Sequence, residues 1–204
     1  MDRSILAIFE EAMRCTQCYG KVPLNVPLPD EKNGGIGAKI LFVYERPGRR
    51  GTGTSGHISF DNKDPTAAFF KKLFSSIGID RRDIFIANAV FCHPLIEDYK
   101  DRRPCKKEIR NCLGFLRRLI DIIQPKLIVT LGGTALTAVK LLFPNCKKLK
   151  HFNLKEEIGE LISETQPVIY PLYHTSFRAR VVRSEQQQMD DWQRIPDVLK
   201  RCES

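Results

Sequence analysis

The sequence lacks the features that direct a chain into or across a membrane. No stretch approaches the roughly 18 consecutive apolar residues of a transmembrane helix. The N-terminus, residues 1–5, has no basic segment followed by a longer apolar one, so we expect no signal peptide. Internal repeats and low-complexity segments are also missing. We therefore expect a cytoplasmic protein, associated with the nucleoid in a prokaryote, whose residues 1–204 form a single domain.

Two common nucleotide-binding signatures are missing as well. A glycine-rich loop covers residues 47–56, but it contains no Gly-Lys-Ser/Thr ending at the start of a helix. Its glycines do not lie at a direct strand-to-helix passage, which a dinucleotide-binding fingerprint requires. The glycine content argues against regular structure and allows a ligand to approach the backbone closely. A flexible loop without a ligand is the alternative.

Acidic residues are too few to balance the basic ones. The chain has 33 Lys and Arg against 24 Asp and Glu, which gives a formal net charge of +9. An excess of this size favours a polyanionic partner, because neutralising phosphates releases their counterions. Nucleic acid is the first candidate, and a merely basic surface is the alternative.

The seven cysteines are an odd number, which argues against a disulfide framework. Cys15 and Cys18 have the spacing of a two-ligand knuckle. Cys92 follows a predicted strand, and Cys112 lies in the next predicted helix. Four thiolates can close a tetrahedral zinc site or hold an iron–sulfur cluster. Four unrelated structural cysteines are the alternative.

Short apolar runs alternate with segments of helical periodicity, which predicts an α/β fold. The predicted strands are residues 40–44, 84–90, 127–131 and 168–172. The predicted helices are residues 4–14, 64–78, 106–123, 133–142 and 185–200. Because the strands are continuously apolar, we expect a three-layer α/β/α arrangement with a central four-stranded parallel sheet.

Ligands of such sheets bind at the carboxyl ends of the strands. Asn88 lies at the end of the second strand, and its amide suits the polar edge of a nucleobase. His174 follows the last strand, where it can donate to charge that develops on a leaving group. A structural asparagine and a capping or core histidine are the alternatives.

Three segments resemble the iron–sulfur uracil-DNA glycosylases, the classes usually numbered four and five. They are Asn-Ala-Val-Phe-Cys-His-Pro at 88–94, the stretch from Pro104 through Glu108 to Cys112, and Gln-Pro-Lys-Leu-Ile-Val-Thr-Leu-Gly at 124–132. Together they look like the family's strand–cysteine–helix–strand core, and the likeness covers nearly the whole chain. The resemblance implies a [4Fe–4S] cluster held by the ligand set Cys15, Cys18, Cys92 and Cys112. Cys105 is the spare cysteine and the rival of Cys112.

Two further segments are similar to the family's conserved motifs. Tyr-Glu-Arg-Pro-Gly at 44–48 resembles a Gly-Glu-Ala-Pro-Gly type of sequence, with Arg46 in place of a small residue. Tyr-His-Thr-Ser at 173–176 resembles the second motif, usually His-Pro-Ser. The resemblance implies that Phe60 stacks on a flipped base, that Asn88 reads its edge, and that His174 binds it and assists catalysis.

The resemblance also implies an acid that activates water. Class four has a second Glu soon after its Pro-Gly, where this chain has Gly51. Class five has an Asp at the start of the next helix, a place that Asp64 fits. We favour Asp64, with Glu45 and Asp61 as alternatives.

The resemblance therefore implies a monofunctional DNA glycosylase that excises uracil or another deaminated base in base excision repair. We expect a monomer whose partner is DNA containing such bases. The side chains expected to contact the DNA are Arg49, Arg50, Ser176, Arg178 and Arg180. Two alternatives are a non-catalytic or covalently trapping relative, with His57 as the trapping nucleophile, and a zinc-stabilised nucleic-acid-binding module.

Overall fold

A computed structural model describes residues 1–49, 51–96 and 102–203. Its centre is a four-stranded parallel sheet of order β5-β3-β7-β8. The strands are β3 (Ile40–Tyr44), β5 (Ile84–Asn88), β7 (Leu127–Leu131) and β8 (Val168–Leu172). This arrangement confirms the predicted α/β fold and the predicted parallel sheet. The side chains of these four strands are almost all buried, because helices cover both faces of the sheet.

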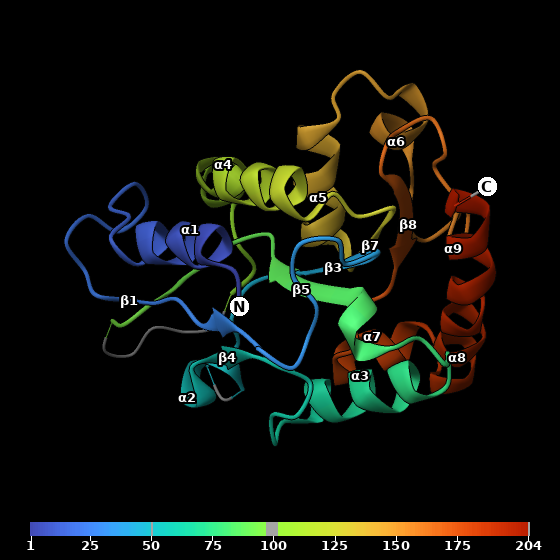
Figure 1. The fold of residues 1–204 in the computed structure, drawn as a ribbon, viewed down its shortest axis with the longest axis horizontal. Coiled ribbons are helices and arrows are strands. Elements are labelled where there is room, and N and C mark those ends of the chain that lie inside the picture. Colours follow the sequence, from blue (N-terminus) through green and yellow to red (C-terminus); the bar gives the residue numbers. More distant parts are fainter. Residues whose placement is uncertain (50, 97–101, 204) are drawn as a thin grey trace.

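Helices on the two faces complete the three layers (Figure 1). One face carries α1 (Arg3–Met13), α4 (Lys106–Ile123) and α5 (Gly133–Leu142). The other face carries α3 (Pro65–Ser75), α7 (Phe177–Val182) and α8 (Glu185–Gln193). A stack of buried aromatic rings joins sheet and helices on this second face. Phe42 of β3 lies parallel to Trp192 at 5.2 Å, and Phe70 of α3 meets the Trp192 ring edge-on at 4.9 Å.

Three predictions for local structure were wrong in detail. The second strand ends at Asn88 and not at residue 90, because its partner β3 ends at Tyr44, which pairs with Asn88. The glycine-rich loop contains a one-turn helix, α2 (Thr52–Ser55), which ends at Gly56 with φ +73°. The predicted C-terminal helix is two helices, α8 and α9 (Ile195–Glu203), because Pro196 has no N–H to continue the first.

Short elements outside the sheet were not predicted. Strand β1 (Leu24–Asn25) pairs with β6 (His93–Pro94), and β2 (Leu28–Pro29) pairs with β4 (His57–Ile58). The remaining elements are α6 (Lys147–His151) and a 3₁₀ turn, η1 (Arg81–Asp83). The two small pairings fasten the segment after α1 to the glycine-rich loop and to the chain beyond β5. Among the described residues, no helix combines the length and apolarity that crossing a bilayer requires.

The strand order fixes where a ligand can bind. The chain passes from β3 outward to β5 and then returns to β7 on the other side of β3. Loops that leave β3 and β7 therefore diverge at the carboxyl edge of the sheet, which is the edge where ligands of such sheets bind.

Candidate active site

A cavity of about 140 Å³ opens at the carboxyl ends of β3 and β5. Its walls come from β3, the glycine-rich loop, the start of α3, β5 and the segment after β8. The residues that line it are Tyr44, Arg46, Gly48, Gly51, Thr52, Ile58, Ser59, Phe60, Asn62, Asp64, Thr66, Ala67, Ile86, Asn88 and His174. A cavity of roughly this volume holds a six-membered ring such as benzene, so this one fits a pyrimidine base.

Asn88 presents a polar group that the protein leaves without a partner. It is the last residue of β5 and is only 3% exposed. Its side-chain nitrogen Nδ2 is buried and finds no hydrogen-bond acceptor among the described residues. Buried donors are almost always paired in folded proteins. Because Asn88 lines the cavity, the missing acceptor is best supplied by a ligand there.

His174 has a fixed tautomer and no charge. Its Nδ1 accepts a hydrogen bond from the Ser176 N–H at 3.0 Å, so in the neutral ring the proton is on Nε2. Burial lowers the pKa of His174 to about 4; the charge of Arg103 acts in the same direction and that of Asp64 against it. A neutral imidazole with Nε2–H is a hydrogen-bond donor to a ligand in the cavity.

Gly132 allows His174 to take this position. A Cβ at Gly132 would lie 3.1 Å from the Cβ of His174, and the glycine has φ +94°, which other residues rarely adopt. The glycine that opens α5 therefore brings the end of β7 close to the segment after β8.

Asp64 is held by the start of helix α3. Its Oδ1 accepts hydrogen bonds from the N–H groups of Thr66, at 3.0 Å, and Ala67, at 3.1 Å, as an N-cap does. The other oxygen, Oδ2, lies against Gly51, where a Cβ atom would overlap it. The absence of a side chain at position 51 therefore leaves room for the Asp64 carboxylate.

The other two candidate acids do not line the cavity. Glu45 accepts a hydrogen bond of 2.5 Å from the Thr134 hydroxyl of α5. Asp61 is surrounded by Arg81, Lys71 and Lys32, and the hydrogen bond from Arg81 is the largest cause that lowers its pKa. Of the three acids, the structure brings only Asp64 together with Asn88 and His174.

Two aromatic residues line the cavity in different ways. Phe60 is 6% exposed, packs nearly parallel to Phe70 at 5.2 Å, and has the Arg81 guanidinium 4.0 Å from its ring centre. Tyr44 meets the His174 ring edge-on at 5.2 Å. Its hydroxyl lies 3.1 Å from the Thr175 hydroxyl. Tyr44 was not among the predicted site residues, although its place at the end of a strand was a signal that it faces the crevice.

The described residues among the predicted DNA contacts differ in exposure and in their partners. The side chains of Arg49 and Arg178 are exposed. Arg180 is engaged with Glu185 at 2.6 Å, and Ser176 donates its N–H to His174. Arg50 lies outside the described residues. The same α7 segment exposes three apolar side chains, those of Phe177, Val181 and Val182.

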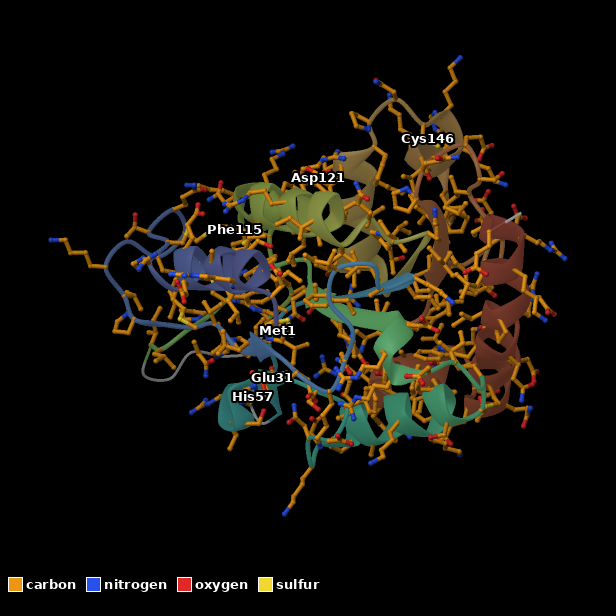
Figure 2. All side chains as sticks on the ribbon, viewed as in Figure 1. Met1, Glu31, His57, Phe115, Asp121 and Cys146 are labelled. Atoms are coloured by element: carbon orange, nitrogen blue, oxygen red, sulfur yellow. The ribbon has the colours of Figure 1, made fainter. Side chains whose placement is uncertain are left out.

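His57, the candidate trapping nucleophile, does not line the cavity. It is exposed on β4 and lies beside α2, at the edge of the molecule (Figure 2). The next residue in the chain, Ile58, does line the cavity.

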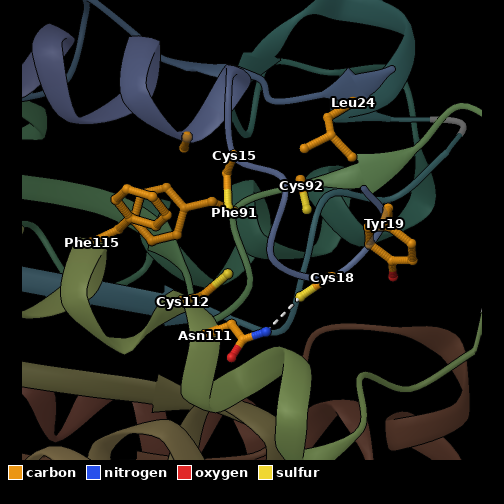
Figure 3. A pocket seen from close by; sticks show the side chains of 10 residues that line it. Cys15, Cys18, Tyr19, Leu24, Phe91, Cys92, Asn111, Cys112 and Phe115 are labelled. Atoms are coloured by element: carbon orange, nitrogen blue, oxygen red, sulfur yellow. Dashed lines mark hydrogen bonds between the residues drawn. The ribbon is translucent and has the colours of Figure 1, made fainter. Parts of the chain in front are cut away.

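A second pocket gathers four cysteines from three segments (Figure 3). Cys15 and Cys18 come from the loop after α1, Cys92 from the segment between β5 and β6, and Cys112 from α4. Their sulfur atoms point toward a common space between apolar walls that include Phe91 and Phe115. Burial raises the pKa of the Cys92 thiol to about 11 and that of Cys112 to about 12.

The donor set of this pocket is four thiols. All seven cysteines are free thiols, so no disulfide competes for the four. A single tetrahedral zinc ion, with Zn–S bonds of about 2.3 Å, would need sulfurs about 3.8 Å apart. Among the described residues, no group of three or more possible ligands converges closely enough to hold one ion. Iron–sulfur clusters are held by four cysteine thiolates, which are the donor type and number that this pocket offers.

The other three cysteines lie outside the pocket. Cys105, the rival of Cys112, is exposed at the start of α4. Cys146 is buried at the start of α6, away from the pocket-lining Phe115 of α4 (Figure 2). Cys202 is on α9.

The sequence profile of the uracil DNA glycosylase superfamily matches residues 31–195. The chain belongs to this superfamily. The resemblance predicted from the motifs is thereby confirmed. The chain is 30% identical over 184 residues to a type-4 uracil-DNA glycosylase of Sulfurisphaera tokodaii, a match that covers 84% of this chain and 74% of the relative.

Other relatives are named as type-4 and type-5 enzymes. A type-4 uracil-DNA glycosylase of Thermotoga maritima is 26% identical, and the match covers 95% of this chain and 94% of that protein. A type-5 uracil-DNA glycosylase of Pyrobaculum aerophilum is 27% identical, with 70% of this chain and 63% of the relative covered.

Arg46, where this member of the superfamily departs from the small residue of its first motif, turns toward the cysteine pocket. Its Nη2 donates to the Cys92 carbonyl oxygen at 3.0 Å and to the Tyr19 hydroxyl at 3.3 Å. Its Nη1 lies 3.8 Å from the Glu108 carboxylate. The positive charge beside the cavity is therefore balanced by a buried carboxylate.

Proposed function

We propose that this protein is a monofunctional uracil-DNA glycosylase that excises uracil from DNA and leaves an abasic site. The observation that carries the proposal is the unpaired, buried Nδ2 of Asn88 in a cavity of pyrimidine size. An amide donor at the base edge suits the carbonyl at position 4 of uracil and not the amino group of cytosine. The names of the type-4 and type-5 relatives agree with this substrate.

The base leaves with the help of His174 and Asp64. As the N-glycosidic bond breaks, negative charge develops on a uracil carbonyl oxygen, and Nε2–H of His174 donates a hydrogen bond to it. The carboxylate of Asp64 faces the sugar cation and orients the water whose oxygen bonds to C1′. The water's protons end on the sugar hydroxyl and on the released base, so uracil and an abasic site are the products.

The lining residues support base removal without strand cleavage. A glycosylase that also cuts the strand needs an amine to form a Schiff base with the sugar. No lysine is among the described residues that line the cavity.

We further propose that Cys15, Cys18, Cys92 and Cys112 hold a [4Fe–4S] cluster. When bound, the cluster would cross-link the loop after α1, the segment after β5 and helix α4 through its iron–thiolate bonds. Its role would be structural, because base excision by the groups above transfers no electron.

DNA would lie over the mouth of the cavity. The exposed guanidinium groups of Arg49 and Arg178 are available to contact phosphates, and we assign the partly buried Ser176 to the same contact surface. Engagement of Arg180 with Glu185 would hold α7 against α8 until a phosphate competes for the arginine.

The Asn88→Asp variant tests the base-reading role. The substitution replaces the amide donor by a carboxylate that repels the uracil carbonyl, so uracil excision should fall about 100-fold, the equivalent of roughly 3 kcal/mol. Excision of cytosine should appear, because its amino group can donate to Asp. Single-turnover assays on oligonucleotides with one uracil or one cytosine measure both rates. Asn145→Asp, at an exposed site, is the control. Unchanged uracil excision in Asn88→Asp would refute the assignment.

The Gly51→Ala variant tests the packing of Asp64. The new methyl group would overlap Oδ2 and push the carboxylate away from its position. Displacement of a reacting group by about 1 Å can lower a rate about 100-fold, and we expect a loss of that order in kcat. Gly114→Ala, in open space on α4, should keep full activity. A fully active Gly51→Ala would mean that the carboxylate position is not critical.

The Cys112→Ala and Cys105→Ala variants distinguish the two rival ligands. Cys112→Ala should lose iron and its brown absorbance, and its thermal midpoint should fall by about 10 °C, or roughly 3 kcal/mol. Cys105→Ala should keep the iron, because its side chain is exposed. Iron analysis and thermal melts of anaerobically purified proteins provide the readout. The opposite result would exchange the two cysteines in the ligand set.

A further inference from the structure

Arg46 lies between the base cavity and the cysteine pocket. It lines the cavity, yet only 6% of its side chain is exposed and its guanidinium contacts the protein on the cysteine side. It reaches the Cys92 carbonyl, the Tyr19 hydroxyl and the Glu108 carboxylate. One side chain therefore touches both sites.

These contacts fall beside three of the four pocket cysteines. The Cys92 carbonyl belongs to a pocket cysteine itself, and Tyr19 directly follows Cys18 in the chain. Glu108 lies one helical turn before Cys112 on α4. Any shift of these segments must therefore move a hydrogen-bond or ion-pair partner of Arg46.

Glu108 is a shared partner of the groups around Arg46. It is buried, and it accepts hydrogen bonds from the Tyr19 hydroxyl, from Arg102 at 2.7 Å and from the Cys105 N–H at 2.7 Å. Burial favours the neutral acid, but these hydrogen bonds outweigh it and lower the pKa of Glu108 to about 2. Charged groups are stable in a protein interior only where their partners stay in place. The position of Arg46 thus depends on the arrangement of the cysteine-bearing segments.

We propose that Arg46 is a positioning residue that couples the cysteine pocket to the base cavity, so that a bound base and a bound cluster stabilise each other. The inference rests on the proposed function and on the proposed cluster, and adds an energetic link between them. Coupling between two sites is reciprocal. If the cluster holds Arg46 in the position that shapes the cavity, a base in the cavity must slow release of the cluster.

The rate of iron release from the cluster-loaded protein tests the coupling. Iron released to a chelator is followed with the protein saturated by DNA containing 2′-fluoro-deoxyuridine, whose fluorine slows bond cleavage, or by the same DNA containing thymidine. In the wild type, uracil DNA should slow iron release at least about fivefold relative to thymidine DNA. In Arg46→Gln, and to a smaller extent in Tyr19→Phe, the ratio should fall toward one.

Arg117→Gln is the matched control. Arg117 is a partly buried arginine of α4 that donates to the Leu142 carbonyl and lines neither pocket, and its variant should keep the wild-type ratio. Tyr19→Phe removes one hydroxyl and no charge, so it reports on the coupling if Arg46→Gln folds poorly. Equal iron release with the two DNAs, or a wild-type ratio in both variants, would overturn the coupling. Binding of the two DNAs is measured on the same samples, and the absence of any preference for uracil DNA would count instead against the proposed function.

Discussion

Replacing Asp64 with asparagine is expected to lower the rate of uracil excision by about 100-fold to 10,000-fold. Asparagine keeps the N-cap hydrogen bonds to Thr66 and Ala67, so the fold of α3 should survive. It removes the negative charge that steadies the sugar cation and orients water. Single-turnover kinetics on a uracil oligonucleotide, with a thermal melt of each protein, separate the chemical loss from unfolding.

The two other acids of the region supply the controls for Asp64. Asp61→Asn removes a carboxylate that pairs with Arg81 and Lys71 outside the cavity, and Glu45→Gln removes one that accepts from Thr134. Both variants should excise uracil within a few-fold of the wild-type rate. A large loss in Glu45→Gln with a mild effect of Asp64→Asn would transfer the water-activating role to Glu45.

Replacing His174 with alanine is expected to lower kcat by about 100-fold to 1,000-fold, the loss typical for one donor to developing charge. The neutral Nε2–H of His174 is such a donor, because its Nδ1 is occupied by the Ser176 N–H. His57→Ala is the matched control and should keep wild-type activity, since His57 is exposed outside the cavity. Loss of activity in His57→Ala instead would revive the trapping mechanism.

The depressed pKa of His174 has consequences that pH titrations can measure. The folded state resists protonation down to about pH 4, whereas the unfolded chain takes up the proton near 6.5. The folded protein should therefore lose stability as the pH falls from 6.5 to about 4, and His174→Ala should lose less. Excision should show no ionisation of His174 between pH 5 and 8. An imidazole NMR titration with a midpoint near 6.5 would contradict this assignment.

The sequence predicted the layers of the fold well because they depend on local patterns. Each strand of the sheet is a short apolar run, and the buried positions of α3 and α4 recur at helical spacing. Most errors arose where contacts between segments distant in sequence determine the bounds of a strand or whether it forms. Pairing with β3 sets the end of β5. The division of α8 from α9 at Pro196 is an exception, because the missing N–H of a proline is a local signal. The two-residue strands β1 and β2 have no pattern of their own and form only because a partner lies beside them.

For the site, the rule that ligands bind beyond the carboxyl ends of strands led to Asn88 and His174, and the resemblance to class five led to Asp64. Sequence motifs could not explain Gly51 or Arg46. The reason for Gly51 is the Asp64 carboxylate against it, which belongs to a residue in another element. The reason for Arg46 is the buried Glu108 on α4. Both depend on distances through space that spacing along the chain does not encode.

One measurement tests the central claim most directly: the yield of free uracil per enzyme molecule from cluster-loaded protein with excess uracil-containing DNA. Alkali then cleaves the abasic strand and provides an independent count. If Asp64 and His174 act on a base that Asn88 reads, each enzyme molecule should release many uracils and leave as many abasic sites. DNA containing only thymidine or cytosine at that position should stay intact. One equivalent per enzyme, with DNA retained on the protein after denaturation, would contradict turnover and indicate covalent trapping. No release from any DNA would contradict the proposed glycosylase itself.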